Sequence, residues 1–131
     1  CGKEEEMDEA AINRLTERVI GCAIAVHREL GPGLLESVYE RALCVELAHE
    51  GLAHEEQKPM AVTYRGQPVG DFRLDLLVEG VLVLELKSVE RHDPLFEAQL
   101  LSYMKLGGYP IGLLINFNSR LLRDGIKRMR I

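Results

Sequence analysis

The chain has 131 residues, of which 47% are hydrophobic and 28% are charged, and its net charge at pH 7 is −5. These values are typical of a globular domain, so we expect residues 1–131 to fold as one unit without a disulfide or a structural metal. No apolar run approaches the roughly 18 residues that a membrane helix requires. The chain begins with an acidic stretch, whereas a signal peptide would begin with a basic stretch followed by an apolar one. Its three cysteines lack C-x-x-C spacing. We therefore expect a reduced, cytoplasmic protein that does not bind membranes.

The charge is unevenly distributed along the chain. Residues 1–10 contain five acidic side chains and one lysine, a net −4, and we expect this segment to be frayed. Residues 118–131 contain five basic side chains and one aspartate, a net +4. A basic cluster of this size is more often a solvated face than a phosphate site. It nevertheless means that the negative total does not exclude a nucleic-acid partner.

Helical and strand periodicities follow one another along the chain. Apolar residues recur every three or four positions over residues 12–30, which predicts an amphipathic helix that ends at Gly31-Pro32-Gly33. A second helix is predicted over residues 34–50. Further elements in chain order are strands over 60–65, 69–77 and 81–89, a helix over 93–106, a buried strand over 111–117 and a weak edge strand over 125–131. This order predicts an α/β fold in which helices cover both faces of a mixed sheet.

Charged side chains interrupt the apolar pattern of two neighbouring strands. Glu85 and Lys87 alternate with leucines, so they project from one face of their strand, about 6.6 Å apart. On the preceding strand Arg73 and Asp75 alternate with the apolar residues at 72, 74 and 76, which places those three on the opposite face.

The length of the loop between these strands decides whether the two carboxylates meet. A two-residue turn would place Asp75 and Glu85 on opposite faces of the sheet. A three-residue loop over 78–80, with Gly80 in the left-handed conformation, would pair Leu77 with Val81 and bring both carboxylates to one face. We predict the odd-length loop.

Two carboxylates and a lysine on a mostly apolar face need partners, because a buried unpaired charge is costly. Asp75, Glu85 and a backbone carbonyl would suit Mg²⁺, and Lys87 would position or polarise an attacking water. The alternative on spacing alone is a functionless set of ion pairs, in which Arg73 contacts Glu85 and Asp75 contacts Lys87.

Polar side chains on two of the predicted helices favour a functional site. Gln99 and Tyr103 lie one helical turn apart among apolar neighbours, so a glutamine there requires a buried partner. Glu36 and Tyr39 lie at the start of the second helix on a stripe that we expect to face inward. A carboxylate in that place again needs a cation or a hydrogen-bond donor.

At these residues the sequence resembles a known family. The segment from Gly33 to Tyr39, GLLESVY, is similar to the signature of the GxxExxY protein family. Asp75 with the later segment 85–87, ELK, resembles the core of the PD-(D/E)XK nuclease superfamily, to which that family belongs. The segment 99–103, QLLSY, resembles the Q-x-x-x-Y element of the RecB-like exonuclease branch. The resemblance extends from about residue 15 to residue 131, and Leu74 stands where the superfamily's name has proline.

The resemblance implies a three-layer restriction-endonuclease-like fold and a Mg²⁺-dependent nuclease, with Mn²⁺ as a substitute, that hydrolyses phosphodiester bonds of DNA. The implied metal ligands are Glu36, Asp75, Glu85 and the Leu86 carbonyl, and the implied catalytic residues are Asp75, Glu85, Lys87, Gln99 and Tyr103. Basic residues that we expect to contact phosphates are Lys58, Arg73, Arg128 and Arg130. The alternative is a catalytically inactive module that keeps the fold to bind nucleic acid or a partner protein. A homodimer is a further expectation for a domain this small.

Overall fold

The computed structural model describes residues 7–131, which form three α-helices, one 3-10 helix and a single sheet of five strands. None of these helices combines the length and the hydrophobicity that a membrane span needs. In chain order the elements are α1 (Glu9–Leu30), α2 (Glu36–His49), β1 (His54–Tyr64), β2 (Gln67–Val78), β3 (Leu82–Lys87), α3 (Pro94–Gly107), β4 (Ile111–Asn116), η1 (Leu122–Gly125) and β5 (Ile126–Arg130).

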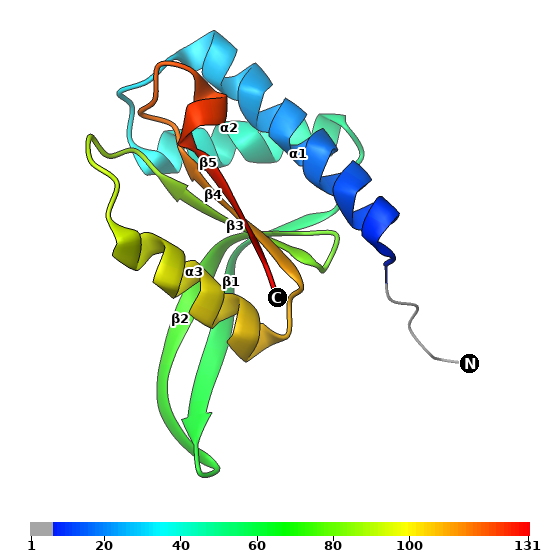
Figure 1. Cartoon of the computed structure of the whole chain (residues 1–131), viewed down its shortest axis with the longest axis vertical. Helices are drawn as coiled ribbons and strands as arrows, with labels where there is room; N and C mark the ends of the chain where they lie inside the picture. The colour runs from blue at the N-terminus through cyan, green and yellow to red at the C-terminus, as the bar shows by residue number, and fades with distance from the viewer. Residues whose placement is uncertain (1–6) are drawn as a thin grey trace.

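The sheet is mixed and lies between two helical layers (Figure 1). The strands lie in the order β1-β2-β3-β4-β5, and β3 and β4 are parallel because α3 connects them. Helices α1 and α2 cover one face with a large apolar cluster, and α3 covers the other with a smaller one. The predicted α/β fold with three layers is therefore confirmed.

Strand β1 is longer than predicted and forms an arm with β2. It begins at His54, six residues before the predicted start, because its first residues are polar and exposed and so lack a strand-like hydrophobic pattern. The far part of the β1–β2 hairpin extends beyond the body of the protein (Figure 1). Its turn at Arg65 and Gly66, both with positive φ, connects Tyr64 to Gln67.

The loop between β2 and β3 has an odd length, as predicted, but its position differs. Val78 lies opposite Leu82, so the three loop residues are 79–81 and not 78–80. Glu79 and Gly80 both adopt positive φ, and the Val81 N–H donates to the Val78 carbonyl at 3.1 Å. A tight turn of this kind matches the twist of the strands, and Val81 is the additional residue.

The predicted alternation of faces along β2 is wrong at Asp75. Leu74 packs in the cluster beneath α3, whereas Leu76 packs in the cluster beneath α1 and α2. The two residues therefore lie on different faces, although they are two positions apart. At the same level of β1, Gln57 has a φ of 55°, and Gln57 and Asp75 are both missing from the β1–β2 register. The sheet is therefore irregular at the level where the face pattern of β2 changes.

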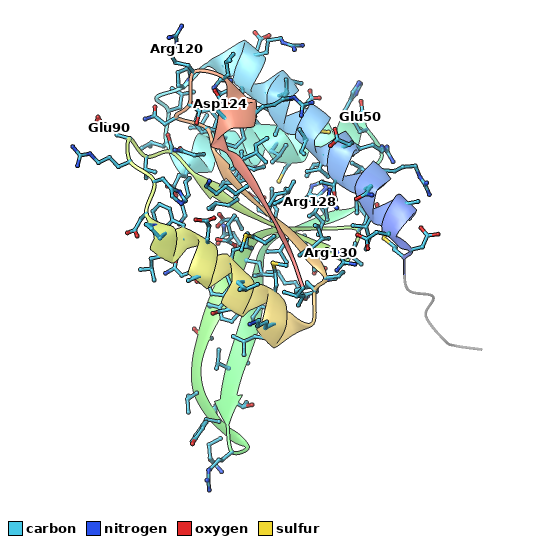
Figure 2. The ribbon with its side chains drawn as sticks, viewed as in Figure 1. Glu50, Glu90, Arg120, Asp124, Arg128 and Arg130 are labelled. Carbon is cyan, nitrogen blue, oxygen red and sulfur yellow. The ribbon has the colours of Figure 1, made fainter. Side chains whose placement is uncertain are left out.

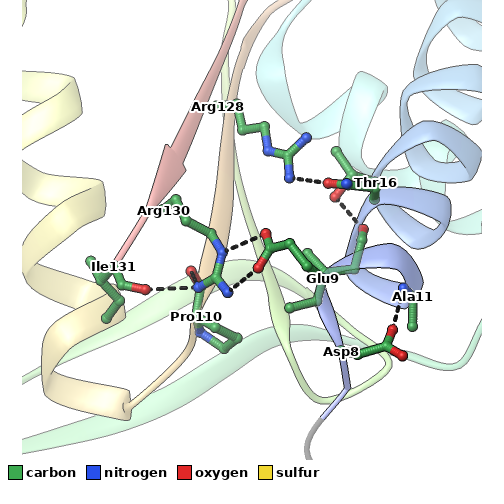
Figure 3. A network of polar contacts seen from close by, with 10 residues as sticks. Asp8, Glu9, Ala11, Thr16, Pro110, Arg128, Arg130 and Ile131 are labelled. Atoms are coloured by element: carbon green, nitrogen blue, oxygen red, sulfur yellow. Dashed lines mark hydrogen bonds and ion pairs between the residues drawn. The ribbon is translucent and has the colours of Figure 1, made fainter.

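The acidic start and the basic end of the chain meet at the β5 edge of the sheet (Figure 3). Of the segment that we expected to be frayed, residues 1–6 lie outside the described part of the chain. Asp8 caps α1 by accepting from the Ala11 N–H at 2.8 Å. Glu9 forms an ion pair with Arg130 at 2.8 Å, and this contact lowers the pKa of the Glu9 carboxyl. Helix α1 therefore begins three residues earlier than its apolar periodicity predicted.

Candidate active site

The two predicted carboxylates meet at the point where β2 and β3 separate. The last backbone pair of these strands joins Leu76 and Leu84. Beyond it, Asp75 Oδ2 accepts from the Leu86 N–H at 2.8 Å, and Glu85 Oε2 accepts from the Asp75 N–H at 3.2 Å. The side-chain carboxylates thus replace backbone carbonyls as acceptors. This replacement opens the sheet locally and holds both carboxylates together.

The backbone of Leu86 adds a third oxygen at the same place. In a strand, the N–H and C=O of one residue point toward the same neighbouring strand. The Leu86 N–H points toward Asp75, so its carbonyl faces the β2 side, where the ladder has ended. The Lys87 carbonyl points the other way and accepts from the Phe117 N–H at 2.9 Å. Leu86 is therefore the residue of β3 that offers a carbonyl beside the Asp75 carboxylate.

Burial makes negative charge costly at both carboxylates. The Glu85 residue is only 8% exposed, and burial raises its pKa to about 8, with the charge of Asp75 as the second cause. Burial also raises the pKa of Asp75, although the Leu86 N–H and the Lys87 charge act in the opposite direction. A bound cation would relieve this cost, because it favours the charged forms.

The ion-pair alternative for these residues is wrong. Across residues 7–131, no salt bridge within 4.0 Å joins Arg73 to Glu85 or Asp75 to Lys87. Arg73 is exposed and donates from Nη1 to the Gln57 carbonyl at 3.1 Å. The Lys87 ammonium lies 4.4 Å from the centre of the Phe96 ring of α3. Lys87 is therefore held at the mouth of the site by an aromatic ring and not by a carboxylate.

Glu36 lies at the rim of the site as the first residue of α2. It is exposed, and its Oε2 accepts from the Ser88 N–H at 3.2 Å, just past the end of β3. The Ser88 hydroxyl donates to the Leu34 carbonyl at 2.6 Å, so the loop before α2 is fixed to the strand that bears Glu85 and Lys87. The charge of Glu36 contributes to the raised pKa of Asp75. The structure thus brings Glu36 near the two carboxylates, at their periphery.

Tyr39 is fully buried and has a structural role. Its hydroxyl donates to the Gly31 carbonyl and accepts from the Leu34 N–H at 3.1 Å. Its ring stacks on Phe117, with 4.4 Å between the centroids. Tyr39 therefore fixes the glycine-rich turn that leads to Glu36.

Replacing Tyr39 by phenylalanine is expected to lower the free energy of unfolding by about 1–3 kcal/mol, because the Gly31 carbonyl and Leu34 N–H lose their buried partner. Urea denaturation measures the change. Tyr64→Phe is the matched control, since Tyr64 is 65% exposed on the arm and its change should stay within about 0.5 kcal/mol. Equal stability of the two variants would contradict the role assigned to Tyr39.

Helix α3 brings one of its two predicted residues toward the carboxylates. Tyr103 is half-buried, stacks on Phe72 at 4.2 Å, and has its pKa raised by burial and then by the charges of Glu85 and Asp75. Gln99 is exposed, so the expectation that it requires a buried partner is wrong. The buried positions of α3 are Leu100 and Met104, and Gln99 lies beside this contact stripe and not within it.

Glu40 and Gln57 belong to the site and were not predicted. Gln57 Nε2 donates to both Glu40 oxygens, at 2.9 and 3.0 Å, and lies 3.5 Å from Asp75 Oδ1. Burial raises the pKa of Glu40 to about 7. Glu40 follows Glu36 by one helical turn, a spacing that could have revealed it. Nothing in the sequence marks Gln57, because its role depends on the irregular backbone of β1.

A family model of the PD-(D/E)XK nuclease superfamily matches residues 13–129. The chain belongs to this superfamily. The match confirms the superfamily, whereas the finer assignment to the GxxExxY family stays a prediction. No curated protein and no solved structure matches the chain significantly.

The residues that meet where β2 and β3 separate fit a divalent cation by their chemistry. In the part of the chain that the structure describes, no three Asp, Glu, His or Cys side chains converge tightly enough to form a preformed metal centre. Asp75, Glu85 and the Leu86 carbonyl are nevertheless adjacent hard oxygen donors, and neither carboxylate has a cationic partner within 4.0 Å among residues 7–131. Mg²⁺ is bound by one or two carboxylates and keeps several waters, so an incomplete protein shell suits it.

The four basic residues that we expect to contact phosphates lie in different places. Arg73 lies on β2 two residues before Asp75 and donates to the Gln57 carbonyl, and Lys58 forms an ion pair with Glu55 at 3.1 Å on β1. Arg128 and Arg130 lie on β5, which β4 separates from the site, and they bond to Asn13 and Glu9 of α1 (Figure 3). The structure therefore joins Arg73 to the backbone of β1 and commits Arg128 and Arg130 to contacts with α1.

Proposed function

We propose that this member of the PD-(D/E)XK superfamily is a Mg²⁺-dependent nuclease that hydrolyses phosphodiester bonds of DNA, with Mn²⁺ as an alternative cation. The observation that carries the proposal is the pair of adjacent carboxylates, the half-buried Asp75 and the buried Glu85, with Lys87 two residues after Glu85 on β3. Their raised pKa values indicate a site that favours a cation.

The residues divide into a cation-binding group and a substrate-orienting group. Asp75, Glu85 and the Leu86 carbonyl would hold the cation, with Glu36 at the rim. A Mg²⁺ ion bound there supplies a positive charge that stabilises the negative charge developing on the phosphate. Gln57 positions the Asp75 carboxylate from the other side, because its amide nitrogen bridges Asp75 and Glu40.

Lys87 and Tyr103 supply the hydrogen-bond donors next to the carboxylates. In hydrolysis, the oxygen of a water bonds to phosphorus and the bond between phosphorus and the leaving oxygen breaks. The Lys87 ammonium orients the water or the phosphate for this step, and its charge favours the transition state. The Tyr103 hydroxyl and the exposed amide of Gln99 lie one turn apart on α3, where they would contact the phosphate from the side of the helix.

The test is cleavage of single-stranded, double-stranded and branched DNA, and of RNA, in Mg²⁺, Mn²⁺ or excess chelator. We expect metal-dependent cleavage of DNA that falls on the order of 100-fold in Asp75→Asn. Asp71→Asn is the matched control, because Asp71 lies on the same strand but is exposed on the arm.

Two results would contradict the proposal. One is the absence of DNA cleavage by a folded protein that binds Mn²⁺, which would favour a binding module without catalysis. The other is cleavage that Asp75→Asn and Asp71→Asn reduce equally.

A further inference from the structure

One hollow on the described surface lies away from the carboxylates and has no part in the mechanism above. It measures about 670 Å³ and lies between the end of α1, the Gly31-Pro32 turn and residues 120–124. This is within the roughly 300–1,000 Å³ that small-molecule sites occupy. A smaller cleft of about 290 Å³ adjoins it at the carboxyl ends of β3 and β4, and Lys87 lines that cleft. The hollow and the cleft share Asp124 in their linings, so they are neighbouring parts of one surface region, the depression.

Basic side chains surround the hollow. Arg28, Arg120 and Arg123 are exposed at its rim, and no acidic group in residues 7–131 lies within 4.0 Å of their guanidinium groups. Lys127 and Lys87 continue the positive charge along the cleft, against Glu90 and Asp124. The depression is thus locally positive on a chain whose net charge is −5. Figure 2 shows Arg120 and Asp124 at one end of β5 and Arg130 at the other.

The basic C-terminal segment is therefore divided between two tasks. Arg128 and Arg130 bond to α1, as described above, and so hold the edge strand in place. Arg120, Arg123 and Lys127 face the depression without such partners. Only the second group has the free positive charge that a polyanion needs.

Apolar side chains contribute to the lining of the hollow, which distinguishes it from a plain phosphate site. Ile24, Pro32, Leu121 and Leu122 contribute to its lining, and Leu121 is 69% exposed. A lining that combines apolar and cationic side chains matches the chemistry of a nucleotide, whose base has an apolar face and whose phosphate is anionic.

The segment between the hollow and the cleft is held rigidly. His27 Nε2 donates to the Ser119 carbonyl at 2.7 Å, and the Ser119 hydroxyl donates to the Asn116 carbonyl at 2.9 Å. A Cβ on Gly125 would lie 2.5 Å from the Asn116 carbonyl oxygen, so only glycine permits this close packing. Asn116 in turn bonds to the backbone of Val89, just after Lys87. The hollow is thus linked by hydrogen bonds to the strand ends that form the site.

We propose that this hollow is a nucleotide subsite for single-stranded nucleic acid. The strand runs from Lys87 through the cleft to the hollow, where one unstacked base lies on Leu121 and Leu122 and the flanking phosphates contact Arg120 and Arg123. The inference deepens the proposed nuclease function and rests on it for the direction of the strand. A single strand fits because the hollow has the size for a base and its sugar, whereas a duplex keeps its bases stacked.

The test measures binding of a fluorescent single-stranded oligonucleotide by anisotropy at several salt concentrations, in a Lys87→Met background that limits hydrolysis. Each phosphate contact on a single strand contributes about 0.7 to the slope of log K against log salt. Arg120→Ala with Arg123→Ala should therefore reduce that slope by about 1.4. The matched control is Arg14→Ala with Lys105→Ala, which removes two exposed positive charges elsewhere and should leave the slope unchanged.

A second measurement tests the apolar part of the lining. An oligonucleotide with abasic sites should bind more weakly than the intact one, and Leu121→Ser should reduce that difference. Equal slopes for the two double variants would overturn the proposal, and so would an acidic peptide that competes as well as the oligonucleotide. A protein that cleaves DNA but keeps its slope in the arginine variant would refute only the subsite. One that shows the slope change but cleaves nothing would refute only the nuclease function.

Discussion

Replacing Lys87 by methionine is expected to lower the rate of DNA cleavage by about 10²–10⁴-fold while cation binding persists. The ammonium lies over the Phe96 ring, and among residues 7–131 no carboxylate holds it within 4.0 Å. Its N–H donors are therefore free to engage the water or the phosphate. Methionine keeps the length and apolar stem of the side chain and removes only the charge and the donors. Single-turnover cleavage measures the rate, and calorimetric titration with Mn²⁺ measures cation binding.

Lys105→Met is the matched control for this experiment. Lys105 lies in the last turn of α3 and is exposed, so its loss changes the net charge equally without altering the site. Cleavage by Lys87→Met at the rate of the unmodified protein would assign Lys87 a packing role against Phe96 only. If Lys87→Met lost both Mn²⁺ binding and cleavage, Lys87 would be needed to form the cation site. That result would contradict the separation of Lys87 from the cation-binding residues.

Periodicity in the sequence predicted the elements that bury an apolar face. Helix α1 and strand β4 were predicted nearly to their ends, since each has one side in the core. The start of β1 was missed for the opposite reason. Residues 54–59, all except Gln57, pair with β2 but bury little, so backbone hydrogen bonds and not hydrophobicity make them a strand. A pattern of side chains cannot reveal an element that side-chain burial does not stabilise.

The candidate site was predictable where neighbouring residues on one strand or helix form it. Spacing alone placed Glu85 and Lys87 on one face, and the parity of the loop brought Asp75 beside Glu85. Gln57 was not predictable, because it reaches the site through a left-handed backbone conformation that glycine usually adopts. At the same level of the sheet the face pattern of β2 changes, so that Leu74 and Leu76 lie on opposite faces. A single residue with a positive φ does not change the spacing of apolar residues in the sequence, so hydrophobic periodicity does not reveal it.

The net charge of the chain also required the structure for its interpretation. The sequence showed a basic C-terminus, which suggested Arg128 and Arg130 as phosphate contacts. Both residues are engaged with α1, whereas Arg120 and Arg123, five to ten positions earlier, face the hollow. Which cations of a cluster remain available depends on the element that carries each one: Arg123 lies in η1, whereas Arg128 and Arg130 lie on β5.

Replacing Glu85 by glutamine is expected to stabilise the metal-free protein at pH 7 by about 3 kcal/mol. The pKa of Glu85 is raised from its ordinary value of 4.5 to about 8 in the folded state, chiefly by burial. Between these values the folded protein holds a proton that the unfolded chain has released, so the free energy of unfolding falls as pH rises from about 4.5 to 8. Glutamine is neutral at every pH, so the variant should not show this fall in the free energy of unfolding. Urea denaturation in chelator at several pH values measures the free energy of unfolding of both proteins.

Glu17→Gln is the matched control, because Glu17 is exposed on α1, and it should keep the pH profile of the unmodified protein. Mg²⁺ is expected to raise the stability of the unmodified protein most at pH 7–8, where the charged form of Glu85 is otherwise penalised, and to have little effect on Glu85→Gln. If Glu85→Gln were no more stable than the unmodified protein at pH 8 in chelator, the buried carboxylate would not be costly. Since that cost is what favours a cation beside Asp75, the proposed metal site would then lose its main physical support.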